Sequence, residues 1–374
     1  MKILWVTNLP SPYRMDFFNE LGKLVDLTVL LERCEADDRD KKWFEIKNKT
    51  FKCIQLQGKG WSMDKSISID IIKYLKNIDY DYCVLGLYSS PTQIIANIYL
   101  RILKKQFIIS TDGGFIKPDK KVSKLIKSFL ISGASNWLST GKSTTKYLEH
   151  YGAKKENIFE YPFTSIRKKD IITLNMLESD EKQKLKKELN IKEKKVILGI
   201  GQFIPRKGFD VLIQAMDTID EDIGCYIIGG IATDEYKNLS KSISNKNIHF
   251  IEFQGKKNIE KYYKCADLFV LPTREDIWGL VINEAMAFGL PVITTDKCIA
   301  GLELIDNGTN GYIIESDNIL QLREKILTIL ENEKLRKEMS TNSLKIIENY
   351  SIEVMAQRHK EIFDAIEYSC GGVV

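Results

Sequence analysis

The strongest constraint on the fold of this chain is an alternation of short apolar runs with segments of helical periodicity. In the first half the expected strands are residues 3–7, 27–31, 51–56, 82–87, 107–110, 137–139 and 158–161. The expected helices between them are residues 15–24, 67–75, 91–104, 120–130 and 143–151. Such alternation predicts a parallel sheet covered on both faces, which binds ligands beyond the carboxyl ends of its strands.

The alternation restarts after a highly charged stretch, residues 167–195, which is typical of a linker followed by a surface helix. Further strands are expected at residues 196–199, 225–228, 248–251, 268–271, 291–294 and 312–314, and the rest of the chain from about residue 319 is helical in pattern. The sequence therefore predicts an α/β protein with two doubly wound, Rossmann-like parallel-sheet domains facing across a cleft. We expect domains at residues 1–168 and 190–350, and a last helix, residues 352–370, that crosses back to complete the first.

Composition narrows the functional classes. The 55 Lys and Arg residues against 51 Asp and Glu are a balance that argues neither for nor against nucleic acid by itself, and we expect no such partner. Seven scattered cysteines without a Cys-x-x-Cys pair fit neither a disulfide framework nor a zinc site, which favours a reducing cytoplasm. No run approaches the ~20 apolar residues that span a bilayer, and we expect the apolar N-terminus to be a buried strand rather than a signal peptide.

Metal-binding patterns are weak. The three histidines are scattered, and the pairs Asp38-x-Asp40 and Asp220-x-Asp222 lie in charged, loop-like stretches. We therefore expect no metal site and no bound cofactor.

The most informative segment runs from Asp267 to Ile293. A buried strand leads into a loop with two acids, Glu275 and Asp276, and a helix is expected to begin near Gly279, with Glu284 about one turn into it. The free N–H groups and positive end of such a helix can hold phosphate or sugar hydroxyls. The other interpretation is an ordinary strand, loop and helix with a capping acid.

The spacing of Asp276 and Glu284, followed by Ala-Met-Ala-Phe-Gly-Leu-Pro-Val-Ile, resembles the Glu-x7-Glu motif of the retaining glycosyltransferases of family 4. This group, also called glycosyl transferases group 1, has the GT-B fold, and the context here is similar to its bacterial surface-polysaccharide members. The resemblance implies that Asp276, or its neighbour Glu275, holds donor-sugar hydroxyls and that Glu284 binds the nucleotide ribose. It further implies donor contacts from the residues between them: Ile277, Trp278, Gly279 and Leu280.

A second group of residues, Gly201 to Gly208, ends a strand with glycines and places Arg206 and Lys207 before a helix. Such cations can stabilise the charge on a departing nucleoside diphosphate, each contact being worth about 1.5 to 3 kcal/mol. The family places an Arg where this chain has Gln202, which leaves open whether Arg206 replaces that charge. An Arg-Lys pair at a helix start is otherwise a common solvated surface feature.

Three further positions are candidates. The family binds the base largely through backbone, here near Phe253. Ser11, a further candidate donor contact, follows the first strand in a Pro-Ser-Pro-Tyr-Arg run. Ser11 is an equally good helix N-cap. Asp112 precedes two glycines after another strand and is able to orient or deprotonate an acceptor hydroxyl, although a plain turn explains it as well.

Residues 117–130 combine five lysines with an apolar stripe at helical spacing. This pattern is typical of a helix that lies on an anionic membrane, and also of a surface helix that packs its apolar face on the sheet.

The resemblance implies a retaining, metal-independent glycosyltransferase with a UDP- or GDP-sugar donor bound by the second domain. The acceptor, bound by the first, is expected to be a glycan or a polyprenyl-diphosphate-linked glycan, in capsule, lipopolysaccharide or exopolysaccharide synthesis at the inner face of the cell membrane. Alternatives are a nucleotide-sugar epimerase or hydrolase of the same fold, and a non-catalytic partner of a transferase.

Overall fold

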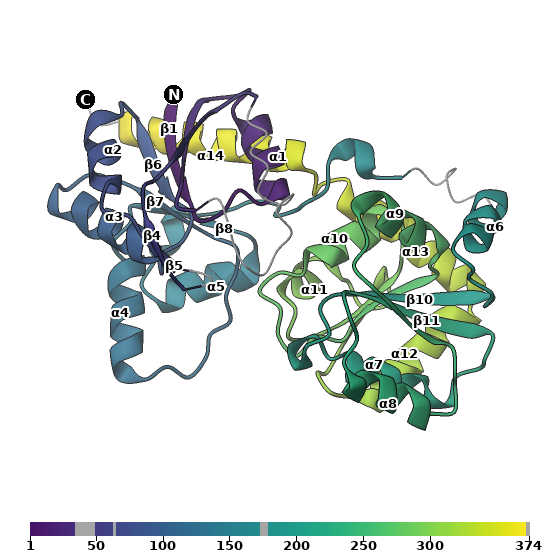
Figure 1. Cartoon of the computed structure of the whole chain (residues 1–374). Coiled ribbons are helices and arrows are strands. Elements are labelled where there is room, and N and C mark those ends of the chain that lie inside the picture. Colours follow the sequence, from purple (N-terminus) through teal and green to yellow (C-terminus); the bar gives the residue numbers. More distant parts are fainter. Residues whose placement is uncertain (34–48, 63–64, 173–178, 372–374) are drawn as a thin grey trace. The chain divides into compact units, whose positions relative to one another are not determined.

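The computed structural model describes residues 1–33, 49–62, 65–172 and 179–371. These form two compact units: an N-terminal unit, Met1–Ser165 with Ser351–Val374, and a C-terminal unit, Ile166–Tyr350. Each unit has its own parallel sheet with flanking helices (Figure 1). The two α/β units confirm the expected fold class.

The N-terminal unit is built on a sheet of seven parallel strands. They are β1 (Lys2–Thr7), β2 (Asp26–Leu31), β3 (Lys52–Gln55), β6 (Tyr82–Leu85), β7 (Ile108–Thr111), β8 (Asn136–Ser139) and β9 (Ile158–Glu160). Their spatial order is β3-β2-β1-β6-β7-β8-β9. The central strands β1, β6 and β7 are almost wholly buried, which is why they read as continuous apolar runs rather than as alternating ones.

Among the described residues of this unit, six α-helices accompany the sheet. They are α1 (Pro12–Leu21), α2 (Ile71–Asn77), α3 (Pro91–Ile102), α4 (Lys121–Ile131), α5 (Lys142–His150) and α14 (Ile352–Gly371). In Figure 1 α14 lies alongside α1, and its His359 ring packs against Trp5 and Phe17 at centroid distances of 5.7 and 4.7 Å.

The expected helix at residues 67–75 is wrong at its start. Ile67 ends an antiparallel strand pair, β4 (Lys59–Ser62) with β5 (Lys65–Ile67), and α2 begins only at Ile71. The alternation Ile67, Ser68, Ile69 fits a strand as well as a helix, so periodicity over so short a run does not distinguish them.

The C-terminal unit has six parallel strands. They are β10 (Lys195–Ile200), β11 (Ile223–Ile228), β12 (Ile248–Ile251), β13 (Leu268–Leu271), β14 (Val292–Thr295) and β15 (Gly311–Ile314). Their order is β12-β11-β10-β13-β14-β15, so the direction of sequence order reverses between β10 and β13. Such a switch point is where ligands bind in open α/β sheets.

Helices cover both faces of this second sheet (Figure 1). On one face are α7 (Phe209–Ala215), α8 (Asp234–Ser242) and α12 (Ile319–Glu331). On the other are α9 (Lys256–Cys265), α10 (Leu280–Ala287) and α13 (Glu333–Ile347), with α6 (Ser179–Glu188) packed on α9 and α11 (Ile299–Leu304) on α10.

Candidate active site

Two loops of the C-terminal unit meet where its strand order reverses. The first follows β10 and runs from Gly201 to Gly208, and the second follows β13 and runs from Pro272 to Gly279. Because β10 and β13 are parallel neighbours, both loops leave the same edge of the sheet. The residues singled out in both sequence motifs therefore lie at the switch point.

The two loops are packed backbone to backbone at Gly208. This residue has a left-handed φ of 69°, and a Cβ added to it would lie 2.0 Å from the carbonyl oxygen of Pro272. The backbone N–H of Arg274 and the hydroxyl of Thr273 both donate to the carbonyl of Arg206, at 2.8 and 2.9 Å. Glycine is therefore required at position 208 for the loops to approach this closely.

This packing brings the two predicted cations to the predicted carboxylate. Lys207 Nζ lies 2.5 Å from Asp276 Oδ2, and Arg206 Nη1 lies 3.8 Å from Asp276 Oδ1 and donates to the carbonyl of Glu275 at 2.7 Å. The Lys207 and Asp276 side chains are only 13% and 14% exposed, so their interaction is weakly screened. Asp276 is thus a carboxylate that contacts both cations.

Asp276 is held by a third segment, the start of α11. Its N–H donates to the carbonyl of Lys297 at 2.8 Å, and its carbonyl accepts from the N–H of Ile299 at 3.2 Å. These bonds form a short parallel bridge between Asp276 and Cys298. The carboxylate therefore sits on a fixed backbone rather than on an open loop.

The helix α10 begins beside this carboxylate. Gly279, at its N-cap, has a φ of 99° and no side chain that caps the helix. A Cβ there would lie 2.8 Å from Cys298 Sγ and 3.8 Å from Asp276 Cγ. The positive end of α10 and its first N–H groups consequently lie next to the Lys207–Asp276 pair, an arrangement that suits an anionic ligand.

Glu284 lies one turn into α10 and is oriented by Tyr263 of α9. The Tyr263 hydroxyl donates to Glu284 Oε2 at 3.0 Å, and its ring stacks on Phe288 at a centroid distance of 5.1 Å. Burial, reinforced by the Glu284 charge, raises the pKa of Tyr263 well above its ordinary value, so the hydroxyl remains a donor. Glu284 itself is half-buried and able to accept hydrogen bonds from a ligand.

The other predicted donor contacts differ in exposure. Gln202, Phe253 and Ile277 are exposed, Phe253 at 64%, at the carboxyl edge of the sheet. Gly201 lies beside Lys207, since a Cβ on it would contact Lys207 Cδ at 3.4 Å.

Trp278 and Leu280 flank Gly279 at the start of α10. The Trp278 indole is buried and donates to Asn283 at 2.8 Å, so Trp278 packs inside the unit while its backbone carbonyl accepts from Ala300. Leu280, the first residue of the helix, is half-buried.

The candidates of the N-terminal unit follow β1 and β7. Ser11 occupies the N-cap position of α1 without making a capping hydrogen bond, and its buried Oγ has no hydrogen-bond partner among the described residues. Asp112 forms an ion pair with the buried Arg14. Although burial opposes it, the Asp112 charge raises the pKa of Arg14, so this cation stays charged. Asp112 is thus tied to a buried cation, a partner that its sequence context did not indicate.

The apolar stripe of the basic helix α4 does not pack on the sheet. Val122, Leu125, Ile126 and Phe129 are 50 to 69% exposed, whereas only Leu130 and Ile131 at its end are buried. The interpretation of residues 117–130 as an ordinary surface helix with its stripe turned inward is therefore wrong. These four side chains and the neighbouring lysines form what we call the α4 surface.

Several positioning residues carry no recognisable sequence signal. Tyr263, Thr273 and the segment 297–300 act through contacts that form only in the folded unit. Asp38 and Asp40 lie outside the described residues. Within the described ranges, no group of three His, Cys, Asp or Glu side chains is placed to hold a metal ion, and no helix is both long and apolar enough to cross a membrane.

Comparisons with known proteins identify glycosyltransferases as similar in sequence and structure. The sequence profile described as glycosyl transferases group 1 matches residues 180–346, which include both loops and Glu284. An uncharacterized glycosyltransferase of Methanocaldococcus jannaschii is 31% identical over 173 residues, 45% of this chain and 48% of that protein. The chain spans about half the length of most of the curated relatives that it matches.

Two matches extend over most of the chain. The N,N'-diacetylbacillosaminyl-diphospho-undecaprenol alpha-1,3-N-acetylgalactosaminyltransferase of Campylobacter jejuni is 23% identical over 79% of this chain and 80% of its own. The crystal structure of Anabaena HepE in complex with UDP superposes with a TM-score of 0.76 at 16% identity, over 98% of this chain and 100% of that one. Residues 180–346 are thus similar to the glycosyl transferases group 1 family, and the chain, with its two parallel-sheet units, has the GT-B fold of the structure on which it superposes.

Proposed function

We propose that this protein is a retaining, metal-independent glycosyltransferase that transfers a sugar from a UDP- or GDP-sugar to a hydroxyl of a glycan or lipid-linked glycan. The observation that carries the proposal is the contact of Lys207 with Asp276 beside the uncapped start of α10. A cation, a carboxylate and free helix N–H groups are the three elements needed to hold a sugar diphosphate.

In this proposal the C-terminal unit binds the donor. Lys207, Arg206 and the N–H groups that follow Gly279 stabilise the diphosphate, and Asp276 accepts hydrogen bonds from donor-sugar hydroxyls. Glu284, oriented by Tyr263, accepts hydrogen bonds from the ribose. The base lies toward the exposed Phe253 and Gln202.

The reaction replaces the bond between the anomeric carbon and the diphosphate oxygen with a bond to the acceptor oxygen. Negative charge grows on the leaving diphosphate as its bond breaks, and Lys207 and Arg206 stabilise it there. The N-terminal unit binds the acceptor, whose hydroxyl proton passes to the departing diphosphate or to Asp112. Arg14 fixes the Asp112 carboxylate.

The two extended relatives support the substrate classes. The name of the Campylobacter relative specifies a diphospho-undecaprenol-linked acceptor, and HepE was crystallised with UDP. A surface-polysaccharide role and a polyprenyl-diphosphate acceptor follow for this chain as part of the proposal.

The α4 surface supports a peripheral position at the inner face of the cell membrane. Val122, Leu125, Ile126 and Phe129 are exposed together beside lysines, and apolar side chains flanked by cations bind anionic lipid. Such binding would keep a lipid-linked acceptor close to the enzyme.

A screen of nucleotide sugars tests the enzymatic proposal. Binding and slow donor hydrolysis are measured for the wild type, Lys207→Ala and Glu284→Ala, with Lys237→Ala as control because Lys237 is an exposed residue of α8 and belongs to neither loop. Each lost charged contact is worth about 1.5 to 3 kcal/mol, so the first two variants should lose roughly tenfold or more and the control nothing. Failure of UDP, GDP and ADP sugars alike to bind, or equal behaviour of all variants, contradicts the proposal.

Vesicle co-sedimentation tests the membrane proposal separately. Wild-type protein should bind vesicles containing anionic phospholipid, and Leu125→Glu should bind at least about tenfold more weakly, because it places a charge in the apolar stripe. Leu320→Glu, at an equally exposed leucine of the C-terminal unit, is the matched control. Equal loss in both variants, or binding to neutral vesicles alone, argues against the α4 surface.

A further inference from the structure

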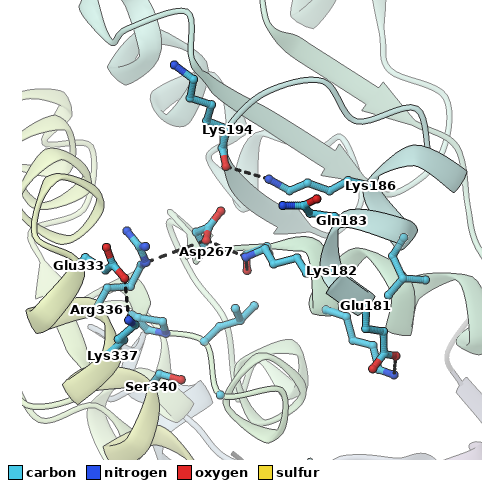
Figure 2. Close-up of a pocket in the computed structure, with 16 residues that line it drawn as sticks. Glu181, Lys182, Gln183, Lys186, Lys194, Asp267, Glu333, Arg336, Lys337 and Ser340 are labelled. Carbon is cyan, nitrogen blue, oxygen red and sulfur yellow. Dashed lines mark hydrogen bonds and ion pairs between the residues drawn. The ribbon is translucent and has the colours of Figure 1, made fainter. Parts of the chain in front are cut away.

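A second pocket of the C-terminal unit lies at the edge of the sheet opposite the candidate active site. It has a volume of about 490 Å³ and lies between α6, α13 and the residues that precede β13 (Figure 2). The loops of the active site follow the carboxyl ends of β10 and β13, whereas Lys194 and Asp267, which line this pocket, precede their amino ends. The four residues of β13 alone separate the two edges by about 13 Å.

Positive charge is in excess in this pocket. Its lining cations come from α6, α9, α13 and the segment before β10. They are Lys182, Lys186, Lys194, Lys264, Arg336 and Lys337. Its lining carboxylates are Glu181, Asp267 and Glu333.

Each of these carboxylates is already engaged by a cation. Asp267 lies at the centre of the view in Figure 2, with Lys182 Nζ at 2.7 Å and Arg336 Nε at 4.0 Å from its Oδ1. Asp267 Oδ2 accepts from the N–H of Val196 at 2.9 Å. Asp267 therefore draws the two cations together but neutralises only one unit of charge.

The outer carboxylates are paired in the same way, Glu181 with Lys264 at 2.8 Å and Glu333 with Lys337 at 2.6 Å. The remaining positive charge of the lining is not balanced within the pocket, although Lys194 also reaches Asp222 outside it at 2.5 Å.

Lys186 contributes to this excess of positive charge, and its hydrogen bonds within the described residues are to neutral backbone carbonyls. Its Nζ donates to the backbone carbonyls of Glu193 and Lys194 at 3.1 and 2.8 Å. Burial lowers the pKa of Lys186, and the opposing effect of the Asp267 charge does not offset it. An anion in the pocket would remove that penalty.

The lining also has the right donors for a phosphate group. Arg336 has a planar fork of N–H groups, Lys186 and Lys337 are ammonium donors, and the hydroxyl-bearing Ser340 of α13 also lines the pocket, next to Lys337 (Figure 2). The volume falls in the range of small-molecule sites. We propose that this pocket binds a small phosphate-bearing anion, independently of the nucleotide-sugar donor.

Calorimetric titration of the full chain with inorganic diphosphate, at constant ionic strength, tests this proposal. The donor site can also hold diphosphate, so the titration is repeated with Lys207→Ala, which should lose only that event. Arg336→Gln should weaken binding at the opposite pocket about tenfold or more, the loss expected for one charge-assisted contact. Lys237→Gln, which removes a cation of the same unit outside the pocket, should change nothing.

A second variant guards against a folding defect in Arg336→Gln. Lys194 and Lys337 are each 76% exposed, so the double variant Lys194→Gln/Lys337→Gln removes two lining charges without disturbing the core. It should weaken the Lys207-independent binding at least about threefold. The proposal is overturned if Lys207→Ala abolishes all diphosphate binding, or if both pocket variants bind as the wild type does.

Discussion

Replacing Gly208 by alanine tests whether the two loops of the active site approach each other as closely as the structure has them. The residue combines a φ of 69° with a Cβ position 2.0 Å from the Pro272 carbonyl oxygen. Ordinary carbon–oxygen contacts are well over an ångström longer, and the obstacle is backbone rather than the end of a flexible side chain. One loop must therefore move, and Lys207 is the adjacent residue.

Two contributions set the size of the effect. A left-handed conformation costs an L-residue about 1 to 2 kcal/mol, partly offset by the lower entropy of the unfolded alanine chain. The steric conflict adds about 1 to 3 kcal/mol, the usual range for overpacking. We expect Gly208→Ala to lower the free energy of unfolding by about 2 to 4 kcal/mol and to weaken nucleotide binding at least tenfold.

Gly308→Ala is the matched control, because Gly308 has a φ of 82° but nothing within 4 Å of its Cβ position. Gly308→Ala therefore incurs only the cost of the left-handed backbone conformation and no steric conflict. We compare the two variants by urea denaturation and by nucleotide titration of the folded proteins. The difference between them gives the cost of the steric conflict at Gly208. If the two variants are equally stable within about 0.5 kcal/mol and bind nucleotide equally well, the close approach of Gly208 to Pro272 is refuted.

Three further predictions concern buried polar groups. Burial lowers the pKa of His359 to about 4 from 6.5, so the stability that neutral His359 contributes is fully present above pH 6.5 and is lost as pH falls toward 4. His359→Gln should remove up to about 3 kcal/mol of the pH dependence of the free energy of unfolding, measured by urea titration at several pH values. An unchanged pH profile in this variant contradicts the prediction. Arg14→Met leaves Asp112 without its partner and should destabilise the protein by about 3 to 5 kcal/mol, which the double variant with Asp112→Asn should partly restore, as thermal unfolding would record. Tyr263→Phe removes the donor to Glu284 and should weaken nucleotide affinity roughly tenfold in equilibrium titration. The free energy of unfolding without ligand should change by no more than about 1 to 2 kcal/mol. Wild-type affinity in this variant would show that Tyr263 does not position Glu284.

The architecture was largely predictable because both sheets are parallel and buried. Strands such as β13 are continuous apolar runs between turn signals, and the helices that follow them have their own period. The start of α2 was missed because a three-residue alternation at Ile67 has no distinctive period. The β4–β5 pair was missed for the same reason.

The site was predictable only where a motif spans neighbouring residues. The spacing of Asp276 and Glu284, and the adjacent Arg206 and Lys207, made these residues candidates, but the contact between the two groups depends on the close approach at Gly208. Tyr263 lies on a different helix, and the sequence around it does not indicate that its hydroxyl donates to Glu284.

The orientation of α4 illustrates the same limit. Its spacing of Val122, Leu125, Ile126 and Phe129 is identical whether the stripe faces the sheet or the solvent. Only tertiary packing decides between them, and here the stripe faces outward.

A crystal structure with the nucleoside diphosphate that stabilises the protein most tests the central claim most directly. The account predicts that the diphosphate lies within hydrogen-bond reach of Lys207 Nζ and the first N–H groups of α10, with the ribose hydroxyls on Glu284. A diphosphate bound only beside Lys186 and Arg336, or a ribose distant from Glu284, would contradict it.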